Sequence, residues 1–259
     1  MSDLTIDDRD GVRTITLDRP ESRNGLTVDV VQRFRDAIRG VPDPVRAIVI
    51  TGGSGAFCSG LDLKDALSRR LASGPELERG LREDFHGLIR ALVESDRPTI
   101  AAVDGAAAGF GCDLALACDL RVISERAVFG EVFVKRGLMP DGGGTWLLPR
   151  IVGVGRALEM LLTGDLVKAD EALRIGLANR LVPQAELATQ VAELAQRIAK
   201  GPPLVHRLVK RAVYAGLDSD LVTALGREAA GQLTLLASRD FGEGVTAFLQ
   251  KRDPSFRGE

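Results

Sequence analysis

The sequence predicts an α/β fold built around a largely parallel sheet. Two segments rich in β-branched residues, 46–51 and 99–103, each end in a glycine-rich turn, and helical periodicity follows both turns. From residue 154 onward the pattern is almost purely helical. Alternation of strands and helices is typical of parallel sheets, because a helix is the usual connection between parallel neighbours.

The chain is expected to begin with a β-hairpin. Residues 4–8 and 12–17 alternate apolar and polar side chains around Asp10-Gly11, a pair that favours tight hairpin turns. A helix is predicted over residues 27–38, where apolar side chains recur at helical spacing. Thr27 is its expected N-cap and Gly40 its expected stop.

The middle of the chain continues the order of helix, strand and glycine turn. Charged, leucine-bearing sequence over residues 63–94 predicts helix, interrupted at Ser73-Gly74-Pro75. The apolar run 106–117 is too long for a strand and predicts a buried helix that starts near Gly109. A further strand is expected over residues 120–123, and further helices over residues 156–162, 168–175, 184–199, 203–215 and 243–251.

Length alone leaves open whether the helical tail is a second domain or a cap. We favour one α/β core over residues 1–200, which carries the functional site, and a helical C-terminal region over residues 201–259 used for assembly. The sequence contains neither an internal repeat nor a low-complexity linker.

Composition and charge exclude several classes of protein. The 34 basic and 36 acidic side chains balance, so no overall positive field attracts nucleic acid or an anionic membrane. Cys58, Cys112 and Cys118 are odd in number and lack C-x-x-C spacing, which argues against a disulfide framework or a zinc site. The acidic start lacks the parts of a secretory signal, and no apolar stretch approaches the roughly 18 to 20 residues that span a bilayer. We therefore expect a cytoplasmic protein without a metal site.

The motifs of several enzyme classes are missing from the sequence. It contains no G-x-x-x-x-G-K-[ST], H-E-x-x-H or G-x-S-x-G, which removes the main support for nucleotide hydrolysis, zincin and serine-hydrolase chemistry. A dinucleotide-binding oxidoreductase is also disfavoured, because no G-x-G-x-x-G follows a strand and opens a helix. His86 and His206 lie in helix-like sequence beside Leu or Val and are interpreted as helix residues.

Carboxylates are then the main candidates for proton transfer. Asp113 lies in the first turns of the apolar helix, where a charged side chain is unusual and therefore suggests a catalytic role. The alternative explanation is a carboxylate that is stabilised by the helix dipole. Asp141 follows Pro140 and opens a glycine loop, where a turn aspartate is the alternative. Glu131 follows a Phe-Gly pair and is interpreted as a solvated surface residue.

The two glycine turns suggest the chemistry of the site. Each is expected to aim bare backbone N–H groups into one cleft, where they would stabilise a developing oxyanion. Glycines beside such groups allow the backbone to approach a ligand closely.

Six motifs, taken in order and with their spacing, identify a known family. They are Asp18-Arg19-Pro20 with Asn24, residues 55–63 (GAFCSGLDL), residues 104–115 (DGAAAGFGCDLA), Phe129-Gly130, residues 137–145 (GLMPDGGGT) and residues 176–182 (GLANRLV). Over essentially its whole length the chain resembles the crotonase superfamily, also called the enoyl-CoA hydratase/isomerase family.

This resemblance implies a crotonase-like repeated ββα superhelix with a helical C-terminal trimerisation region, assembled as a homotrimer or a dimer of trimers. It implies an acyl-CoA substrate and no cofactor, since coenzyme A is part of the substrate. The thioester oxygen would lie in an oxyanion hole formed by the backbone N–H groups of Leu61 and Phe110. Contacts to coenzyme A are implied for Ser22, Arg23, Ala56 and, across a subunit interface, Lys251, for which a solvated helix face is the alternative.

The chain departs from the family pattern at the acid/base positions. Typical hydratases of the family carry two glutamates, at positions that here hold Asp113 and Phe133. A phenylalanine cannot move a proton, whereas Asp141 matches the position of a catalytic aspartate in several isomerases of the family. Phe133 and Trp146 are expected to line the acyl pocket.

We therefore expect an enzyme that stabilises a thioester enolate and shifts a double bond, with Asp141 as the principal acid/base and Asp113 as the second polar group. Two alternatives remain open. One is an enoyl-CoA hydratase, which adds water to trans-2-enoyl-CoA through Asp113 and Asp141. The other is a catalytically silent acyl-CoA binding protein, which the aromatic side chain at position 133 favours.

Overall fold

A six-stranded sheet forms the centre of the molecule in the computed structural model, which describes residues 3–68 and 74–259. Its strand order is β1-β2-β3-β4-β6-β9; β1 and β2 are antiparallel, and every other neighbouring pair is parallel. The predicted parallel sheet is therefore confirmed. The strands are β1 (Leu4–Arg9), β2 (Val12–Leu17), β3 (Ala47–Gly52), β4 (Thr99–Val103), β6 (Leu120–Ser124) and β9 (Arg180–Val182).

The N-terminal hairpin and the first helix form as the local sequence predicts. Asp10 and Gly11 both have positive φ angles, of 49° and 77°, as the tight turn between β1 and β2 requires. The helix α1 covers Val28–Arg39, and the Thr27 hydroxyl accepts a hydrogen bond from the Val30 N–H at 3.3 Å. Each feature depends on neighbouring residues alone, which is why the sequence suffices to predict it.

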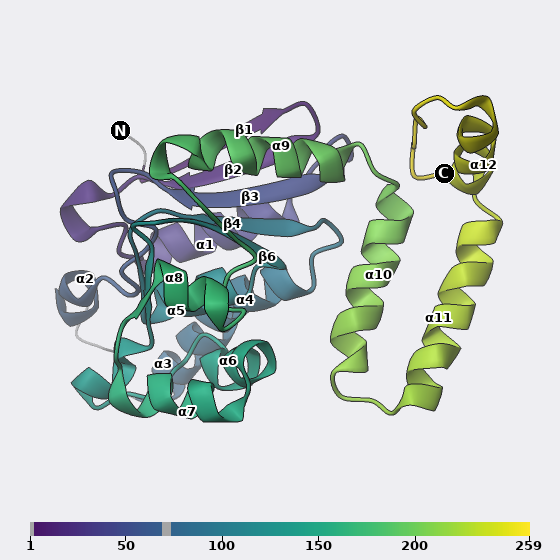
Figure 1. The fold of residues 1–259 in the computed structure, drawn as a ribbon. Helices are drawn as coiled ribbons and strands as arrows, with labels where there is room; N and C mark the ends of the chain where they lie inside the picture. The colour runs from purple at the N-terminus through teal and green to yellow at the C-terminus, as the bar shows by residue number, and fades with distance from the viewer. Residues whose placement is uncertain (1–2, 69–73) are drawn as a thin grey trace.

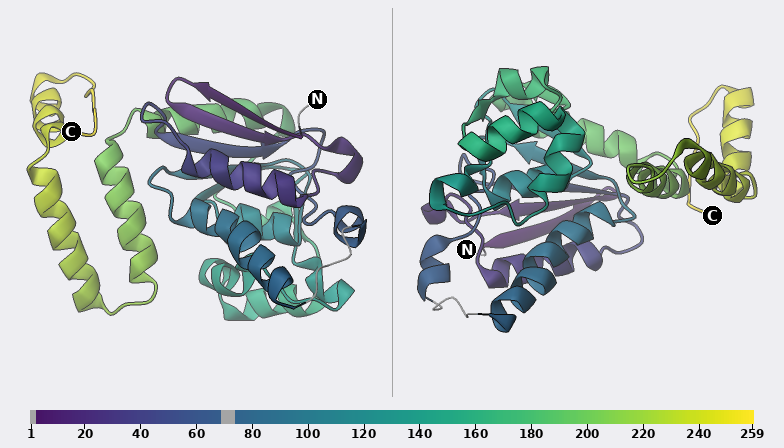
Figure 2. Two further views of the ribbon diagram at one scale, coloured as in Figure 1. Left: turned by 180° about the vertical axis from the view of Figure 1, so that it is seen from behind. Right: turned by 90° about the horizontal axis from the view of Figure 1, so that it is seen from below.

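Helices cover both faces of the sheet (Figure 1). Alternate strand residues divide between two apolar clusters: Ala47 and Val49 pack with the helix α9 (Leu187–Ala199), whereas Ile48 and Ile50 pack with α1 and α4 (His86–Val93). Figure 2, seen from behind, shows α1 and α4 on the face opposite α9. The period-two alternation of a strand thus places a hydrophobic side chain on each face of a sheet that is buried on both sides.

A second, three-stranded sheet lies beside the first and carries parts of the site. It consists of β5 (Ala106–Ala108), β7 (Val128–Gly130) and β8 (Val167–Lys168), with β5 parallel to β7 and β8 antiparallel to it. The apolar run that predicted one helix is therefore divided: its first residues form β5, and α5 (Phe110–Leu116) begins after Gly109. Pairing with a distant strand decides this division, which local periodicity does not show.

The helices named in the sequence analysis follow the predicted order with two corrections, and helices also form at Gly144–Val152 and Leu221–Leu236, where none was named. The region after residue 154 is not purely helical, because β8 and β9 interrupt it and β9 extends the central sheet. The region 63–94 divides into several helices, and Ser73 of its predicted interruption lies outside the described residues. The other helical segments are α2 (Leu63–Ser68), α3 (Pro75–Gly80), α6 (Gly144–Val152), α7 (Val154–Thr163), α8 (Ala169–Arg174), a π-helix (Leu81–Phe85) and 3-10 helices at Pro20–Ser22, Val132–Arg136 and Gln184–Glu186.

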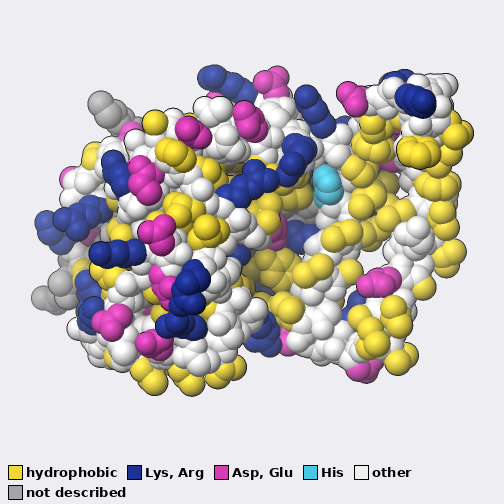
Figure 3. Space-filling model, in the orientation of Figure 1, with side chains coloured by type: hydrophobic (Ala, Val, Ile, Leu, Met, Phe, Trp, Pro, Cys, Tyr) yellow, Lys and Arg dark blue, Asp and Glu magenta, His cyan; other side chains and the backbone are white. Residues whose placement is uncertain are grey.

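Three C-terminal helices extend away from the sheet. The helices α10 (Pro203–Gly216) and α11 (Leu221–Leu236) form a hairpin beside the core, and α12 (Arg239–Gln250) follows at the far end of α11 (Figures 1 and 2). Apolar side chains gather along this arm in Figure 3. Its exposed apolar residues are Val209, Val213, Leu217, Leu221, Val222, Leu225, Leu233, Leu236, Phe241, Val245, Phe248 and Leu249. Within the described ranges, no helix is long and apolar enough to cross a membrane.

Candidate active site

The two glycine turns predicted to share a cleft lie against each other. Cys58 pairs with Ala107 in a parallel bridge, and the Ala108 N–H donates a hydrogen bond to the Cys58 carbonyl at 3.0 Å. The N–H groups of Phe57 and Cys58 both donate to the Ala106 carbonyl, each at 3.0 Å. Backbone hydrogen bonds therefore fix the relative position of the two turns.

This pairing places two backbone N–H groups side by side. Gly60 has a φ of +90°, and a Cβ there would lie 2.8 Å from the Ala108 carbonyl oxygen and 3.2 Å from the Phe110 nitrogen. A larger residue than glycine would therefore be strained and would collide with the opposite turn. In the described part of the chain, the N–H groups of Leu61 and Phe110 donate no hydrogen bond, and both residues line the same cavity.

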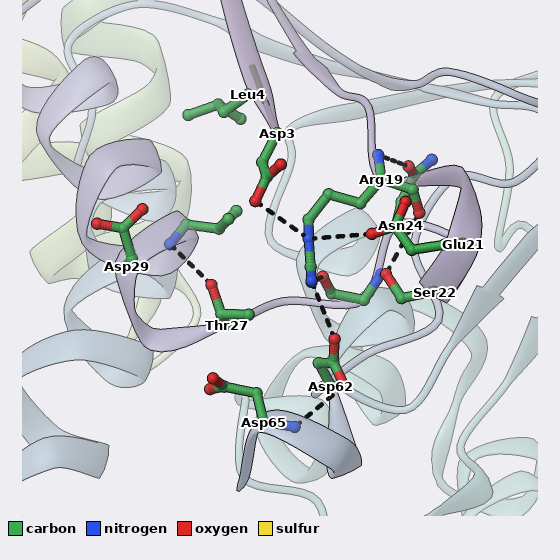
Figure 4. Close-up of polar contacts among 12 residues, drawn as sticks. Asp3, Leu4, Arg19, Glu21, Ser22, Asn24, Thr27, Asp29, Asp62 and Asp65 are labelled. Atoms are coloured by element: carbon green, nitrogen blue, oxygen red, sulfur yellow. Dashed lines mark hydrogen bonds and ion pairs between the residues drawn. The ribbon is translucent and has the colours of Figure 1, made fainter. Parts of the chain in front are cut away.

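Polar contacts from the first motif hold the Leu61 segment in place (Figure 4). The Arg19 guanidinium lies 3.1 Å from the Asp62 carboxylate, and both side chains are almost buried. The Leu26 N–H donates to the Gly60 carbonyl at 2.8 Å, and the Asp62 N–H donates to the Leu26 carbonyl at 2.9 Å. The residue on each side of Leu61 is thus anchored, while the Leu61 N–H donates no hydrogen bond within the described residues.

A cavity of about 290 Å³ opens between the two turns and the helices around α2 and α3. Its wall is mostly apolar, and the rings of Phe85 and Phe110 pack edge to face with centroids 5.2 Å apart. The apolar lining residues are Val28, Leu61, Leu63, Leu81, Phe85, Phe110, Val132, Phe133 and Leu138. A pocket of this kind suits a hydrophobic acyl group.

Asp141 lines this cavity together with Gly109 and Phe110. It precedes the glycines that lead into α6, and its side chain is partly buried. Burial raises the pKa of its carboxyl above the ordinary value of 3.8, while the nearby His86, when protonated, lowers this pKa. A carboxyl group with a raised pKa beside two free N–H groups can exchange a proton with a bound molecule.

Asp113 lies behind the Asp141 loop and does not line the cavity. Its side chain is 0% exposed, and its Oδ2 accepts a hydrogen bond from the Gly142 N–H at 3.0 Å. Burial raises the pKa of Asp113 well above its ordinary value, and the negative charges of Glu131 and Asp141 raise it further. The N–H groups of Gly142 and Gly144 oppose this rise.

Glu131 is not a surface residue, and that prediction is wrong. The side chain is 0% exposed, and neither carboxyl oxygen has a hydrogen-bond partner of good geometry. Burial raises its pKa to about 7; the Cys112 thiol lowers it and the charge of Asp141 raises it. The sequence carried a signal for this burial, because Glu131 stands between the apolar runs Val128-Phe129 and Val132-Phe133-Val134.

Of the two aromatic residues predicted to line the pocket, only one does so in the structure. Phe133 lines the cavity and contacts the space beside Gly109, whereas Trp146 is not among the lining residues. The Arg150 guanidinium instead stacks over the Trp146 ring, 4.1 Å from its centroid. His86, which the sequence analysis interpreted as a helix residue, does begin α4, and its positive charge lowers the pKa of Asp141.

The predicted coenzyme A contacts fall in two places. Ser22, Arg23 and Ala56 lie beside the first glycine turn: the Ser59 hydroxyl donates to the Ser22 carbonyl at 2.7 Å, the Ser59 N–H donates to the Arg23 carbonyl at 3.1 Å, and the buried Asn24 side chain donates to the Ala56 carbonyl at 2.7 Å. Lys251 follows α12 at the far end of the C-terminal arm, away from the cavity of its own chain (Figure 1). In the described ranges, no group of three or more His, Cys, Asp or Glu side chains is arranged to hold a metal ion.

The ordered strands and the shared cavity define an α/β protein of the crotonase-fold class, and comparison with known proteins agrees. A family model described as enoyl-CoA hydratase/isomerase matches residues 7–259. The chain superimposes on a solved enoyl-CoA hydratase from Bacillus anthracis with a TM-score of 0.94 and 31% identity, over 100% of both chains. It is 43% identical to a "probable enoyl-CoA hydratase" of Rhodobacter capsulatus, over 96% of this chain and 95% of that protein.

It is also 36% identical to the 1,2-epoxyphenylacetyl-CoA isomerase of Escherichia coli, over 96% of each chain. The chain belongs to the enoyl-CoA hydratase/isomerase family and is an enzyme that acts on acyl-CoA thioesters. The family name covers two activities, hydration and isomerisation, which require different acid/base residues in the cavity.

Proposed function

We propose that the protein shifts a double bond in an enoyl-CoA thioester, with Asp141 as the acid/base and an oxyanion hole formed by the N–H groups of Leu61 and Phe110. The proposal is supported by the position of Asp141, whose carboxyl lines the same cavity as the two N–H groups. Phe133 lines this cavity where a second acid would be required for two-carboxylate addition of water.

The proposed reaction needs one carboxylate and no redox partner. Asp141 removes a proton from a carbon alpha or gamma to the thioester, and the electron pair moves into the conjugated enolate. The negative charge on the thioester oxygen is stabilised by the two N–H groups, which need not reorganise as the charge develops. The protonated Asp141 then returns the proton to a different carbon of the chain, which moves the double bond and restores the carboxylate.

Two of the other acidic residues that line the cavity, Asp84 and Glu76, are less suited to this role. Asp84 accepts hydrogen bonds from Gln32 and Arg35, each at 3.1 Å, which holds it in an ion pair. Glu76 is exposed to solvent. Asp141 combines partial burial, a raised pKa and proximity to the Phe110 turn.

We infer that coenzyme A binds at the mouth of the two turns through the backbone of Ser22, Arg23 and Ala56. Lys251 lies too far along the arm to serve the cavity of its own chain, so we assign it to the nucleotide phosphates of a molecule bound to another subunit (Figure 1). Lys251→Ala should then raise the KM for acyl-CoA without lowering kcat.

We infer that residues 201–259 assemble the chain into a homotrimer or a dimer of trimers. The exposed apolar side chains of the arm support this, since Val222 is 79% and Phe248 is 83% exposed in the single chain. Large apolar side chains gathered on one extended element usually pack against a partner. Light scattering after size exclusion would test this inference, and a monomer would contradict it.

Hydration of trans-2-enoyl-CoA is the second candidate. It is favoured by the name of the Rhodobacter capsulatus relative, and Asp141 would then act on a water molecule. Water addition changes the mass of the product, whereas isomerisation does not, so the two activities are separable.

The deciding experiment incubates the purified protein with trans-2-enoyl-CoA and trans-3-enoyl-CoA in deuterated buffer and follows products by mass spectrometry. Bond migration or deuterium uptake without hydration, lost in Asp141→Asn, would establish the isomerase. Water addition would establish the hydratase. Binding of both CoA esters without turnover of either would contradict both candidate activities.

The oxyanion hole has its own test at Leu61. Leu61→Pro deletes one N–H donor and should lower kcat by roughly 10² to 10³, the effect of removing such a donor in other enzymes. Leu61→Ala keeps the N–H and is the matched control for lost side-chain contacts. Equal losses in both variants would contradict the role of the N–H group.

A further inference from the structure

Two carboxyl groups lie buried behind the Asp141 loop, and neither has a counter-ion among the residues that the structure describes. Asp113 and Glu131 are both 0% exposed. Elsewhere in the described chain a buried lysine, Lys210, pairs with Asp119, whereas no cation pairs with Asp113 or Glu131. An unpaired charge in such a place is costly, so a buried carboxyl group tends to keep its proton.

Oxygen atoms of both carboxyl groups lie close to the α-carbon of Gly144. A Cβ built at Gly144 would lie 2.4 Å from Oδ1 of Asp113, and 3.2 Å and 3.3 Å from the two oxygens of Glu131. The missing side chain of Gly144 therefore leaves the space in which these oxygens meet. Two ionised carboxylates this close would repel each other strongly, as in other carboxyl pairs that share a site.

A hydrogen bond connects this pair to the proposed acid/base. The Gly142 N–H belongs to the peptide bond that joins Asp141 to Gly142, and it donates to Oδ2 of Asp113 at 3.0 Å. A Cβ at Gly142 would lie 2.6 Å from the Cβ of Asp113, so the loop packs directly on this side chain. The orientation of the Asp141 backbone thus depends on Asp113.

We propose that Asp113 and Glu131 form a buried acid pair that retains at least one proton at neutral pH and positions Asp141 through the Gly142 peptide. Both are positioning residues, because neither lines the cavity. The titratable groups that face the pair are Cys112 on α5 and Asp141 in the loop, and His86 on α4 faces Asp141 in turn. Only the kinetic part of this proposal rests on the proposed function.

The proton state is tested without substrate. At neutral pH, infrared spectra in deuterated buffer should show the carbonyl band of a protonated carboxyl group in the wild type, because exposed carboxyl groups are then ionised. The band should vanish in the double variant Asp113→Asn with Glu131→Gln. A wild type without the band, or a double variant that keeps it, would overturn the shared proton, whatever reaction the enzyme catalyses.

The positioning role is tested by two substitutions at Asp113. Asp113→Asn keeps an acceptor for the Gly142 N–H and offers Glu131 a donor, so kcat should stay within about tenfold of wild type, the range of one ordinary hydrogen bond. Asp113→Leu offers no acceptor and should lower kcat on the order of 100-fold through misplacement of Asp141, with KM little changed. If Asp113→Asn loses as much activity as Asp141→Asn, Asp113 transfers the proton itself and the positioning role is wrong.

The pH profile gives a further readout that does not depend on the fold of the leucine variant. When the pair ionises, a second negative charge faces Asp141 and the enolate, so kcat should fall on the alkaline side. Glu131→Gln removes one of the two ionising groups and should therefore shift the pH of this fall. An unchanged alkaline profile would overturn the coupling between the pair and Asp141.

Discussion

Two polar clusters, one around Asp119 and one formed by Asp113 and Glu131, show how carboxyl groups of one protein serve different ends. Asp119, between α5 and β6, accepts hydrogen bonds from the Thr99 N–H at 2.7 Å, the Thr99 hydroxyl at 2.9 Å and the Tyr214 hydroxyl of α10 at 3.1 Å. Lys210 lies 2.8 Å from it and also donates to the Leu92 carbonyl. Asp113 and Glu131, behind the cavity, have no such cation in the described residues.

The presence or absence of a paired cation separates Asp119, which has a structural role, from Asp113 and Glu131, which can hold a proton. A carboxylate that is paired and fully hydrogen-bonded keeps its charge and ties α10 to the sheet. Carboxyl groups buried without a cation keep or share a proton, and their charge responds to neighbours and to pH. The comparison predicts that an Asp→Asn exchange lowers stability at Asp119, whereas at Asp141, in the loop that packs on Asp113, it lowers activity.

The largest effect is expected for Asp141→Asn. An amide cannot accept the substrate proton, so kcat/KM should fall by roughly 10² to 10⁴, the usual contribution of a general acid or base. Binding of a CoA ester, measured by calorimetry, should change little. Turnover near the wild-type level would remove Asp141 from the mechanism.

The same substitution at Asp119 is expected to act on stability. Asp119→Asn leaves the Lys210 ammonium buried without its counter-charge, which should lower the free energy of unfolding by about 3 to 5 kcal/mol. Urea denaturation measures this change, and kcat per folded molecule should remain as in the wild type. A loss of kcat without a loss of stability would show that this cluster also takes part in the chemistry.

Glu131→Gln should change how stability depends on pH. The folded protein holds the Glu131 proton up to about pH 7, whereas the unfolded chain releases it near 4.5, so wild-type stability falls as pH rises through this window. Glutamine has no proton to lose. The variant should therefore gain up to about 3 kcal/mol over the wild type between pH 4.5 and 7, since one pKa unit corresponds to about 1.4 kcal/mol.

Denaturation at several pH values measures this gain. A constant difference across the window would mean that Glu131 titrates alike in the folded and the unfolded chain. Glu76→Gln, at an exposed position, is the matched control and should show no such gain.

The smallest effect is expected for His86→Gln. Proton abstraction needs ionised Asp141, so kcat/KM should fall as pH falls through the pKa of that group, which burial places above 3.8. The protonated His86 lowers this pKa, so the variant should shift the acid limb to higher pH. The rate on the limb should drop by about fivefold at most, because partly solvated charge pairs contribute up to about 1 kcal/mol. A shift to lower pH would contradict the assigned interaction.

Local patterns predicted most of the fold because their causes lie within a few residues. The turn at Asp10-Gly11, the Thr27 cap and the period-two strands depend on neighbours in the chain, and each is confirmed. The strands Ala106–Ala108 and Arg180–Val182 were missed, because short segments become strands only through distant partners, here Val128–Gly130 and Leu120–Ser124.

The site was predictable to the extent that backbone motifs define it. The glycine turns and the position of Asp141 follow from motif order, and the structure brings these residues to one cavity. Glu131 was misplaced because its charge outweighed its apolar neighbours in the sequence analysis, whereas the folded chain encloses it between β7 and the helices. Lys251 was expected to contact coenzyme A across a subunit interface, and the structure places it directly after α12, the last helix of the extended arm.

The sequence by itself determined the family, the alternation of strand and helix, and the two turns that present backbone N–H groups, because these depend on residue type and spacing along the chain. Only the tertiary structure decided which carboxyl groups lie in the cavity and which lie behind it. Burial and charge pairing arise from segments far apart in sequence, so the roles of Asp141, Asp113 and Glu131 separate only when the chain is folded.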